Sequence, residues 1–235
     1  MHRLLHLLFL PIVLFFTGCA STQHNNPKDP FESFNRGVYQ LNDNLDRAIL
    51  KPVAKGYDAA MPGFAKTMVS NFLSNLDDVI VTANDVLQLK FNQALSDSSR
   101  VIFNTTFGVF GLFNVTDNLE KHHEDFGQTL GYWGVPSGPY LMLPLLGPSS
   151  VRDGTGIYVD SYASVISNTQ DVPTRNSGYA LQGIDKRVDL LEQEKVLDGS
   201  VMDRYSFIRD AYLAHRQNLV YDGNPPREKY DDDDQ

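Results

Sequence analysis

The sequence predicts a mainly α-helical protein with few or no strands. Apolar side chains recur every three or four residues in several separate stretches, which is the spacing of one helix face. Runs that alternate apolar and polar residues, as strands do, are poorly represented. Residues 129–151 are free of charge over 23 positions and contain four glycines and four prolines, so they predict an irregular segment between helices.

Residues 1–18 are typical of a bacterial export signal. Arg3 supplies a basic start, residues 4–16 form an apolar core, and small residues follow at a cleavage site. The core is too short to span a membrane as a helix. We therefore expect this segment to direct export and then to be removed.

The cleavage site resembles the lipobox of bacterial lipoproteins. Phe16-Thr17-Gly18-Cys19 places two small residues before a cysteine, with Phe16 in place of the usual leucine. Cys19 is the only cysteine, so it cannot form a disulfide within the chain. We predict that Cys19 is a lipid anchor, because three acyl chains would hold it firmly at a membrane; the alternative is an ordinary signal peptide with a chance cysteine. Ala20, where aspartate commonly retains such proteins in the inner membrane, favours the periplasmic side of the outer membrane.

The composition is that of a folded, acidic protein. Hydrophobic residues make up 42%, and the formal net charge is −9, or −10 once Arg3 leaves with the signal. An acidic chain is not attracted to nucleic acid or to anionic head groups, so any membrane contact must be apolar. We expect a lipidated tether over residues 19–30, a single helical domain over residues 31–220, and an acidic, disordered tail over residues 221–235.

Apolar stripes place the expected helices. Asp29 can cap the first helix, and Pro52 ends or kinks it. Residues 92–107 and 149–164 are also expected to be helical, whereas residues 171–177 are expected to form a loop. The stripes comprise Phe31, Phe34, Val38, Leu41 and Leu45; Phe64, Met68, Phe72, Leu76, Ile80, Ala83 and Leu87; Leu181, Ile184, Val188 and Leu191; and Tyr205, Ile208, Tyr212, His215 and Leu219.

Residues 101–116 form a second charge-free run, which is too short for an ordinary membrane span. Its aromatic side chains recur every three or four residues. One interpretation is a buried core helix followed by a turn; the other is a segment that lies at a membrane interface. In the second interpretation the membrane-facing residues are Phe103, Phe107, Phe110 and Phe113.

The longer charge-free segment, residues 129–151, has the length of a membrane span but not its composition. No continuous helix tolerates prolines at Pro136, Pro139, Pro144 and Pro148, because each interior proline removes a backbone donor and costs about 3 kcal/mol. Irregular backbone at membrane depth requires shelter by protein or a cavity. The alternatives are such a sheltered segment and a rigid loop packed on a soluble core.

No residue pattern predicts catalysis, a metal or a cofactor. Residues 122–125, His-His-Glu-Asp, lack the one-turn spacing of a zinc-binding histidine pair and are expected to form a hydrogen-bonded turn. Residues 153–156, Asp-Gly-Thr-Gly, only faintly resemble an aspartic protease loop. His215 lies on an apolar stripe and is expected to be a core or interface histidine. The chain has neither a nucleophile elbow nor a phosphate-binding glycine loop, and we predict that it is not an enzyme.

Three stretches together resemble the MlaA (VacJ) family of lipoproteins. They are DPFESFNRGVYQLNDNLD at residues 29–46, KPVAKGYDAAMP at residues 51–62, and DFGQTLGYWGVPSGPYLMLPLLGPSSVRDGTG at residues 125–156. The resemblance runs in order along nearly all of the mature chain and includes the lipobox. The acidic tail has no counterpart in it.

The resemblance implies a ring of amphipathic helices around a central channel, with charges inward and aromatic side chains outward. Such proteins associate with trimeric porins, remove mislocalised phospholipids from the outer leaflet of the outer membrane, and pass them to a periplasmic carrier protein. The alternatives are a porin-docking lipoprotein that transports nothing and a phospholipase. The resemblance places the candidate residues that shape the channel or ring in the Gly/Pro-rich segment, at Gly131, Trp133, Gly134, Gly138, Pro139, Tyr140 and Pro144.

Overall fold

A computed structural model of the chain describes residues 26–197 and 202–226. The predicted export signal, the anchor Cys19 and the end of the tail beyond residue 226 lie outside the described residues. The description begins before the expected domain start at residue 31. Lys28 already belongs to the folded part, since its carbonyl accepts a hydrogen bond from the Tyr140 backbone N–H at 2.9 Å.

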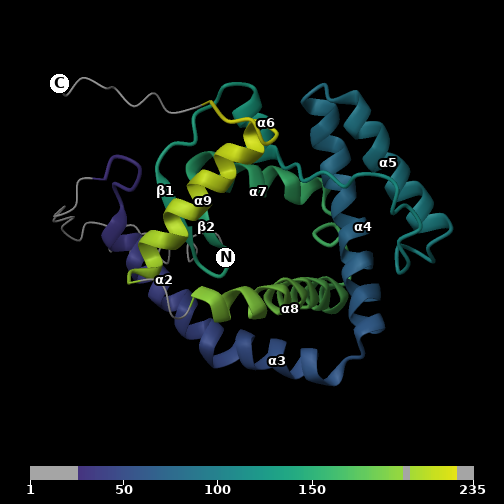
Figure 1. Cartoon of the computed structure of the whole chain (residues 1–235), viewed down its shortest axis with the longest axis horizontal. Coiled ribbons are helices and arrows are strands. Elements are labelled where there is room, and N and C mark those ends of the chain that lie inside the picture. Colours follow the sequence, from purple (N-terminus) through teal and green to yellow (C-terminus); the bar gives the residue numbers. More distant parts are fainter. Residues whose placement is uncertain (1–25, 198–201, 227–235) are drawn as a thin grey trace, which may run out of the picture.

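The described chain is mainly helical, as predicted (Figure 1). Its one sheet within those residues is a short antiparallel hairpin. The loop expected over residues 171–177 is wrong, because a helix already begins at Val172. The elements in order are α2 (Glu32–Leu45), the π-helical turn η2 (Asp46–Leu50), α3 (Lys51–Ala60), α4 (Gly63–Leu87), α5 (Phe91–Thr106), α6 (Phe126–Tyr132), β1 (Tyr140–Leu143), β2 (Gly147–Ser150), α7 (Val151–Ala163), α8 (Val172–Leu197) and α9 (Arg204–Val220).

The elements close into a ring. Helix α2 packs on β1, β2 contacts α7 and α9, α7 contacts α4, α4 contacts α8, and α8 packs on α3, which leads back through η2 to α2. Figure 1 shows these elements around an open centre, with α5 on the outer side of α4. The predicted ring of helices is therefore confirmed.

Side chains at the helix starts explain several turns of the chain. Asp125 caps α6 by accepting a hydrogen bond from the Gln128 backbone N–H, and Ser150 caps α7 in the same way. The expected cap at Asp29 is not formed, since Phe31 occupies the N-cap of α2. The kink expected near Pro52 takes the form of η2, a π-helical turn that ends just before α3.

The Gly/Pro-rich segment contains the hairpin of β1 and β2, with Tyr140 opposite Ser150 and Leu143 opposite Gly147. The free edge of β1 meets two amide side chains of α2 instead of a third strand. Asn35 donates to the carbonyl of Tyr140 and accepts from the N–H of Met142. Two helical turns further on, Asn42 does the same with the backbone of residues 143 and 145. Side-chain amides thus satisfy the backbone groups that an edge strand leaves unpaired.

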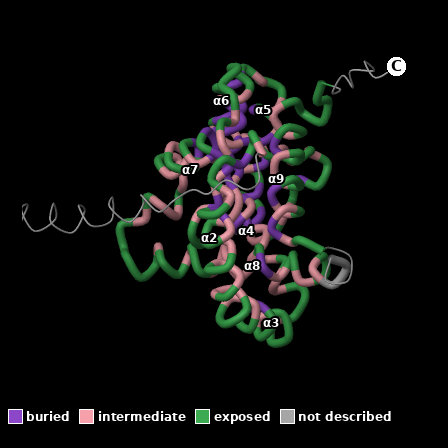
Figure 2. Tube along the Cα trace, turned by 90° about the vertical axis from the view of Figure 1, so that its left-hand side faces the viewer, coloured by how far each residue is buried: buried purple, intermediate pink, exposed green. Residues whose placement is uncertain are grey.

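The apolar core is small and the buried positions are mostly polar. A cluster of Val38, Tyr140, Met142 and Tyr205 joins α2, β1 and α9. Figure 2 shows the buried segments along the middle of the molecule, with exposed segments on both sides. This distribution is the reverse of that in most water-soluble domains, whose fully buried side chains are predominantly apolar.

Candidate functional site

The inverted distribution, with polar side chains buried and apolar side chains exposed, is clearest on α2. Three members of its predicted apolar stripe, Phe31, Phe34 and Leu41, are about half exposed, and of that stripe only Val38 is buried in the core. Asn35, by contrast, is fully buried. Helix α5 repeats the pattern, because its buried positions include Asp97 and Arg100. The candidate site therefore has two parts, a polar network inside and an apolar outer surface.

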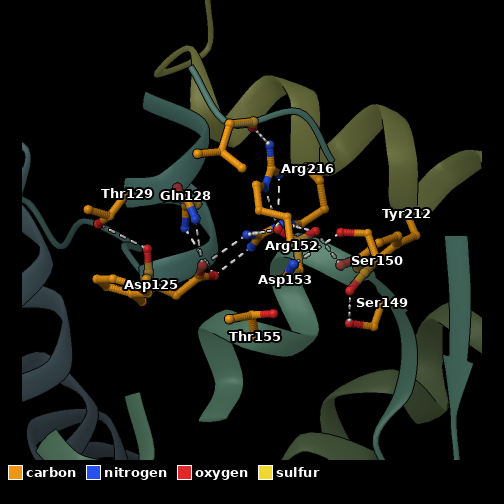
Figure 3. Close-up of polar contacts among 12 residues, drawn as sticks. Asp125, Gln128, Thr129, Ser149, Ser150, Arg152, Asp153, Thr155, Tyr212 and Arg216 are labelled. Carbon is orange, nitrogen blue, oxygen red and sulfur yellow. Dashed lines mark hydrogen bonds and ion pairs between the residues drawn. The ribbon is translucent and has the colours of Figure 1, made fainter. Parts of the chain in front are cut away.

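The densest part of the network surrounds Arg216 of α9 (Figure 3). Its guanidinium donates to Asp125 at the start of α6, with one contact at 2.9 Å, and to both oxygens of Asp153 in α7 at 3.0 and 3.2 Å. Tyr212, one turn earlier on α9, donates its hydroxyl to Asp153 at 2.7 Å. Arg152 adds a second ion pair to Asp153 at 2.9 Å. One arginine thus joins three helices of the ring.

The charges in this cluster are fixed by their partners. Burial by itself raises the pKa of Asp125 and Asp153, but the hydrogen bonds and charge of Arg216 outweigh it and lower both pKa values. Burial also lowers the pKa of Arg216, yet its two carboxylates raise it overall. The cluster is consequently a fully ionised, neutralised network over the physiological pH range.

A second cluster joins the chain start to α2 and α9. Asp29 accepts hydrogen bonds from Asn35 at 2.8 Å, from the Tyr205 hydroxyl, and from Arg209 at 3.2 Å. Burial and this carboxylate raise the pKa of Tyr205, which stays protonated as a donor. The sequence assigned Asp29 to a helix cap, but its structural role is to hold α2 against α9.

Two further clusters join other neighbours in the ring. On α4, Asp78 accepts from Arg100 at 3.3 Å and from Lys121 at 2.6 Å, which links α4, α5 and the segment before α6. Between η2, α3 and α8, Arg187 bonds Asp46 and Glu194 at 2.7 Å each. A 2.9 Å contact from Lys51 to Glu194 completes that group.

The outer surface carries the predicted membrane-facing residues. Phe103 lies near the end of α5, Phe107 lies just beyond it, and Phe110 and Phe113 lie in the turns that follow. All four side chains are exposed, that of Phe110 at 72%. The rings of Phe103 and Phe107 stack with centroids 6.0 Å apart. The interpretation of this run as a buried core helix is therefore wrong.

The glycines among the predicted ring-shaping residues have distinct surroundings. Gly131 lies in α6, where an added Cβ would approach Arg152 Nη1 to 2.7 Å. Gly134 and Gly138 adopt φ values of +89° and +69°, which glycine tolerates best. Trp133 is half exposed, and its indole N–H donates to the Leu87 carbonyl at 3.2 Å. These residues connect α6 to α4 and to the hairpin.

The remaining predicted residues lie in or beside the hairpin. The Pro139 carbonyl accepts from the Val151 backbone N–H at 3.2 Å. Tyr140 is fully buried between Tyr205 and Tyr212, and its hydroxyl lacks a hydrogen-bond partner within the described part of the chain. Pro144 is exposed at the hairpin tip beside Leu145, whose side chain is 80% exposed. The seven residues therefore span both the core and the outer surface.

The other residues singled out by the sequence either make hydrogen bonds within the fold or are exposed at its surface. His122 contacts Asp97 at 2.7 Å and Glu124 accepts from Gln88 at 2.7 Å, so residues 122–125 are hydrogen-bonded as expected. His215 is exposed, so its interpretation as a core histidine is wrong. The described residues include no group of three or more His, Cys, Asp or Glu side chains arranged to hold a metal ion.

The two arginines that organise the interior, Arg209 and Arg216, were not predicted from the sequence. They lie seven residues apart on α9 and therefore on one face, as do Asn35 and Asn42 on α2. Polar residues at heptad spacing, opposite or beside an apolar stripe, were the available signal. That spacing alone does not predict burial, because polar positions on an amphipathic helix normally face water.

The fold and this site define a class of protein, a helical ring with a polar interior and an apolar exterior. None of the helices within the described ranges is long and apolar enough to cross a bilayer. The profile of the family described as MlaA lipoprotein matches residues 27–219. The chain belongs to the MlaA lipoprotein family, which confirms the resemblance seen in the sequence.

Relatives and a solved structure agree with this assignment. The chain is 34% identical over 232 residues to the intermembrane phospholipid transport system lipoprotein MlaA of Escherichia coli, covering 92% of this chain and 91% of that protein. It is 39% identical to an uncharacterised protein of Rickettsia felis, but that match spans only 55% of the relative's length and 57% of this chain. A structure presented as the structural basis for maintenance of bacterial outer membrane lipid asymmetry matches with a TM-score of 0.73 at 31% identity, covering 82% of this chain and 98% of that one.

Proposed function

We propose that this protein removes mislocalised phospholipids from the outer leaflet of the outer membrane through an amphipathic channel in its ring. It passes them to a periplasmic carrier and so maintains lipid asymmetry. The observation that carries the proposal is the inverted distribution of side chains, with carboxylates and arginines inside and aromatic and aliphatic residues outside. The names of the relative in Escherichia coli and of the similar solved structure support the same role.

The inverted distribution fits a protein surrounded by lipid. Exposed apolar surface is unfavourable in water at about 25 cal/mol per Å², and this penalty disappears when acyl chains cover the surface. A phospholipid has a charged head and two apolar tails, so its path requires a polar side and an apolar side. A ring of amphipathic helices lying in one leaflet supplies both without any helix that crosses the bilayer.

The proposal extends to the anchor and the partners. Cys19 is lipidated and holds the protein on the periplasmic side of the outer membrane. Trimeric porins bind the ring, and a periplasmic lipid carrier receives the phospholipid. The protein acts without hydrolysing its lipid, and the proposed transfer requires neither a cofactor nor a metal.

The Gly/Pro-rich segment shapes the path in this proposal. Gly138→Val tests it, because valine would strain a φ of +69° and its Cβ would lie 3.4 Å from Val151. Pro144→Ala tests the exposed hairpin tip. Gly183→Ala is the control, since nothing described lies within 4 Å of the added Cβ. Unchanged outer-membrane integrity and lipid asymmetry in both test variants would remove the path-shaping role but leave the transport proposal intact.

The decisive experiment deletes the gene and measures surface-exposed phospholipid. We expect the level to rise on deletion and to return with the intact gene, but not with a Cys19→Ala copy. A level that does not rise would overturn the proposal. A protein that binds porin without changing surface phospholipid would be a docking lipoprotein, and release of free fatty acid or lysolipid from outer-membrane vesicles would identify a phospholipase instead.

A further inference from the structure

Asp85, near the end of α4, is a buried carboxyl group without a donor. The residue is fully buried, and neither carboxyl oxygen accepts a hydrogen bond from an N–H or O–H donor of the described residues. Other buried carboxyls are satisfied: Asp78 meets Arg100 and Lys121, and Asp153 meets Arg216. A buried ionised carboxylate with neither a cation nor an N–H donor is strongly unfavourable.

The surroundings of Asp85 are acidic. Asp97 of α5, also fully buried, lies within hydrogen-bonding reach of the Asp85 carboxyl, and the charge of Glu124 faces it from the segment before α6. His122 from the same segment also lies nearby, but its ring contacts Asp97 at 2.7 Å. Two carboxylates can form a hydrogen bond to each other only if a proton lies between them.

The nearby cations are engaged elsewhere. Lys90 donates its backbone N–H to the Asp85 carbonyl, while its ammonium pairs with Glu124 at 2.9 Å and Asp222 at 2.6 Å. Arg100 on α5 lies 4.0 Å from Asp97 and bonds Asp78 more closely. 

The acids on the other helices that pack against α4 have their own partners as well. Asp125 of α6 pairs with Arg216, and Asp160 of α7 accepts from Asn84 at 2.9 Å. On α8, Asp185 is hydrogen-bonded by Ser70. Within the described ranges, a proton is therefore the available neutralising partner for Asp85.

We propose that Asp85 and Asp97 form a proton-binding site, in which one proton carried by Asp85 joins α4 to α5 and, through His122, to the segment before α6. The bond runs from the protonated Asp85 carboxyl to the Asp97 carboxylate, which also accepts from His122. Burial, and next the charge of Asp97, raise the pKa of Asp85 to about 7, in agreement with this arrangement. The proton is thus a structural component of the ring wall built by α4 and α5.

The site makes stability depend on pH in a defined direction. The pKa of Asp85 rises from about 4 in the unfolded chain to about 7 in the folded one, so the folded state binds the extra proton between these values. Its stabilisation is complete below about pH 4, declines as the pH rises towards 7, and is lost above 7. Above that pH, a second negative charge beside Asp97 weakens the packing of α4 on α5.

The first test observes the proton directly. The full lipidated chain in detergent micelles is labelled with ¹³C at aspartate Cγ, and the Asp85 signal is assigned by its loss in Asp85→Asn. We expect this signal to titrate with a midpoint near 7. A midpoint in the ordinary aspartate range, below about 5, would overturn the proposal.

The second test compares two buried aspartates of α4. An asparagine at position 85 donates to Asp97 as the protonated acid does, so Asp85→Asn is expected to melt about 3–8 °C above the wild type at pH 8 and to lose the dependence between pH 5 and 8. Asp78→Asn, the control, loses two cationic partners and is expected to melt below the wild type at every pH. An Asp85→Asn protein that is less stable than the wild type at pH 8 would contradict the proposal, and so would a wild-type melting temperature lowered by EDTA, which would indicate a bound metal cation.

Discussion

Replacing Arg216 with methionine would remove the one cation that Asp125 and Asp153 share. Methionine keeps an unbranched side chain of similar reach, so the change tests charge and hydrogen bonding more than volume. The variant leaves two carboxylates without their strongest partner, and the side chain of Asp153 is only 5% exposed. Tyr212 and Arg152 would remain as partners of Asp153, whereas Asp125 would keep only donors from its own helix start.

The magnitude follows from this geometry. Breaking a buried ion pair on one side destabilises a protein by about 3–5 kcal/mol, because the remaining charge is desolvated and uncompensated. This corresponds to roughly two to four orders of magnitude in the folding equilibrium constant. The partners that Asp153 retains place the expected loss in the lower half of that range. The loss should shrink as the pH falls, because without Arg216 burial raises the pKa of both carboxylates and they become protonated in the variant before they do in the wild type.

The assay is equilibrium denaturation of the full chain in detergent micelles, followed by measurement of surface-exposed phospholipid in cells. Arg47→Met is the matched control, since Arg47 is 60% exposed and its ion pair with Asp43 is worth no more than about 0.5 kcal/mol. Adding Asp153→Asn to Arg216→Met should recover part of the loss, because one uncompensated charge disappears. If Arg216→Met costs less than about 1 kcal/mol, or no more than the control, Arg216 does not hold the ring together.

Three further changes test other parts of the structure by the same denaturation assay. Tyr140→Phe should leave the free energy of unfolding unchanged or raise it by up to about 1 kcal/mol, because the deleted hydroxyl is buried without a hydrogen-bond partner in the described chain. A clear loss of stability would mean that the hydroxyl does have a hydrogen-bond partner. Gly156→Ala should lower the free energy of unfolding by about 1–3 kcal/mol, because its Cβ would lie 2.3 Å from a backbone nitrogen of α6. Gly183→Ala, whose Cβ would meet nothing within 4 Å, should raise it by about 0.5–1 kcal/mol. Equal effects of the two changes would contradict the close contact between α6 and α7. Partial burial raises the pKa of Glu194, but hydrogen bonds from Arg187 and Lys51 lower it to about 2. Stability should therefore fall as the pH drops from about 4.5 towards 2, and Glu194→Gln should make that slope shallower; an unchanged slope would contradict the role of Glu194.

The sequence predicted the helices better than it predicted their orientation. Periodicity places a helix over residues 31–45 whichever face is buried, so the stripe containing Phe31 was recognised correctly. Whether that stripe meets a core or a bilayer depends on the surroundings of the whole chain, and only the family resemblance indicated the outward direction. Asn35 is buried because it binds the backbone of β1, a contact across more than one hundred residues that leaves no local pattern.

The hairpin and the ion-pair clusters were beyond prediction for a related reason. Strands of four residues carry too little alternation to be detected among prolines and glycines, and β1 is completed by side chains from a distant helix. Arg216 meets partners 63 and 91 residues away, and a lone arginine on a helix is ordinarily assigned to solvent. Of these residues, only Asp125 has a role that the sequence could indicate, because an aspartate just before an apolar run predicts a helix cap.

The two asparagines of α2 also govern how the hairpin can move. Asn35 and Asn42 hold β1 at points two helical turns apart, so a slide or rotation of α2 would break both pairs together. Helix and hairpin are therefore mechanically coupled and should shift as a single body. Occupation of the strand edge has a second effect, since β1 offers no open backbone row to which another chain could add a strand. In a ring that exposes so much apolar surface, this edge is therefore closed to strand addition, one common route to aggregation.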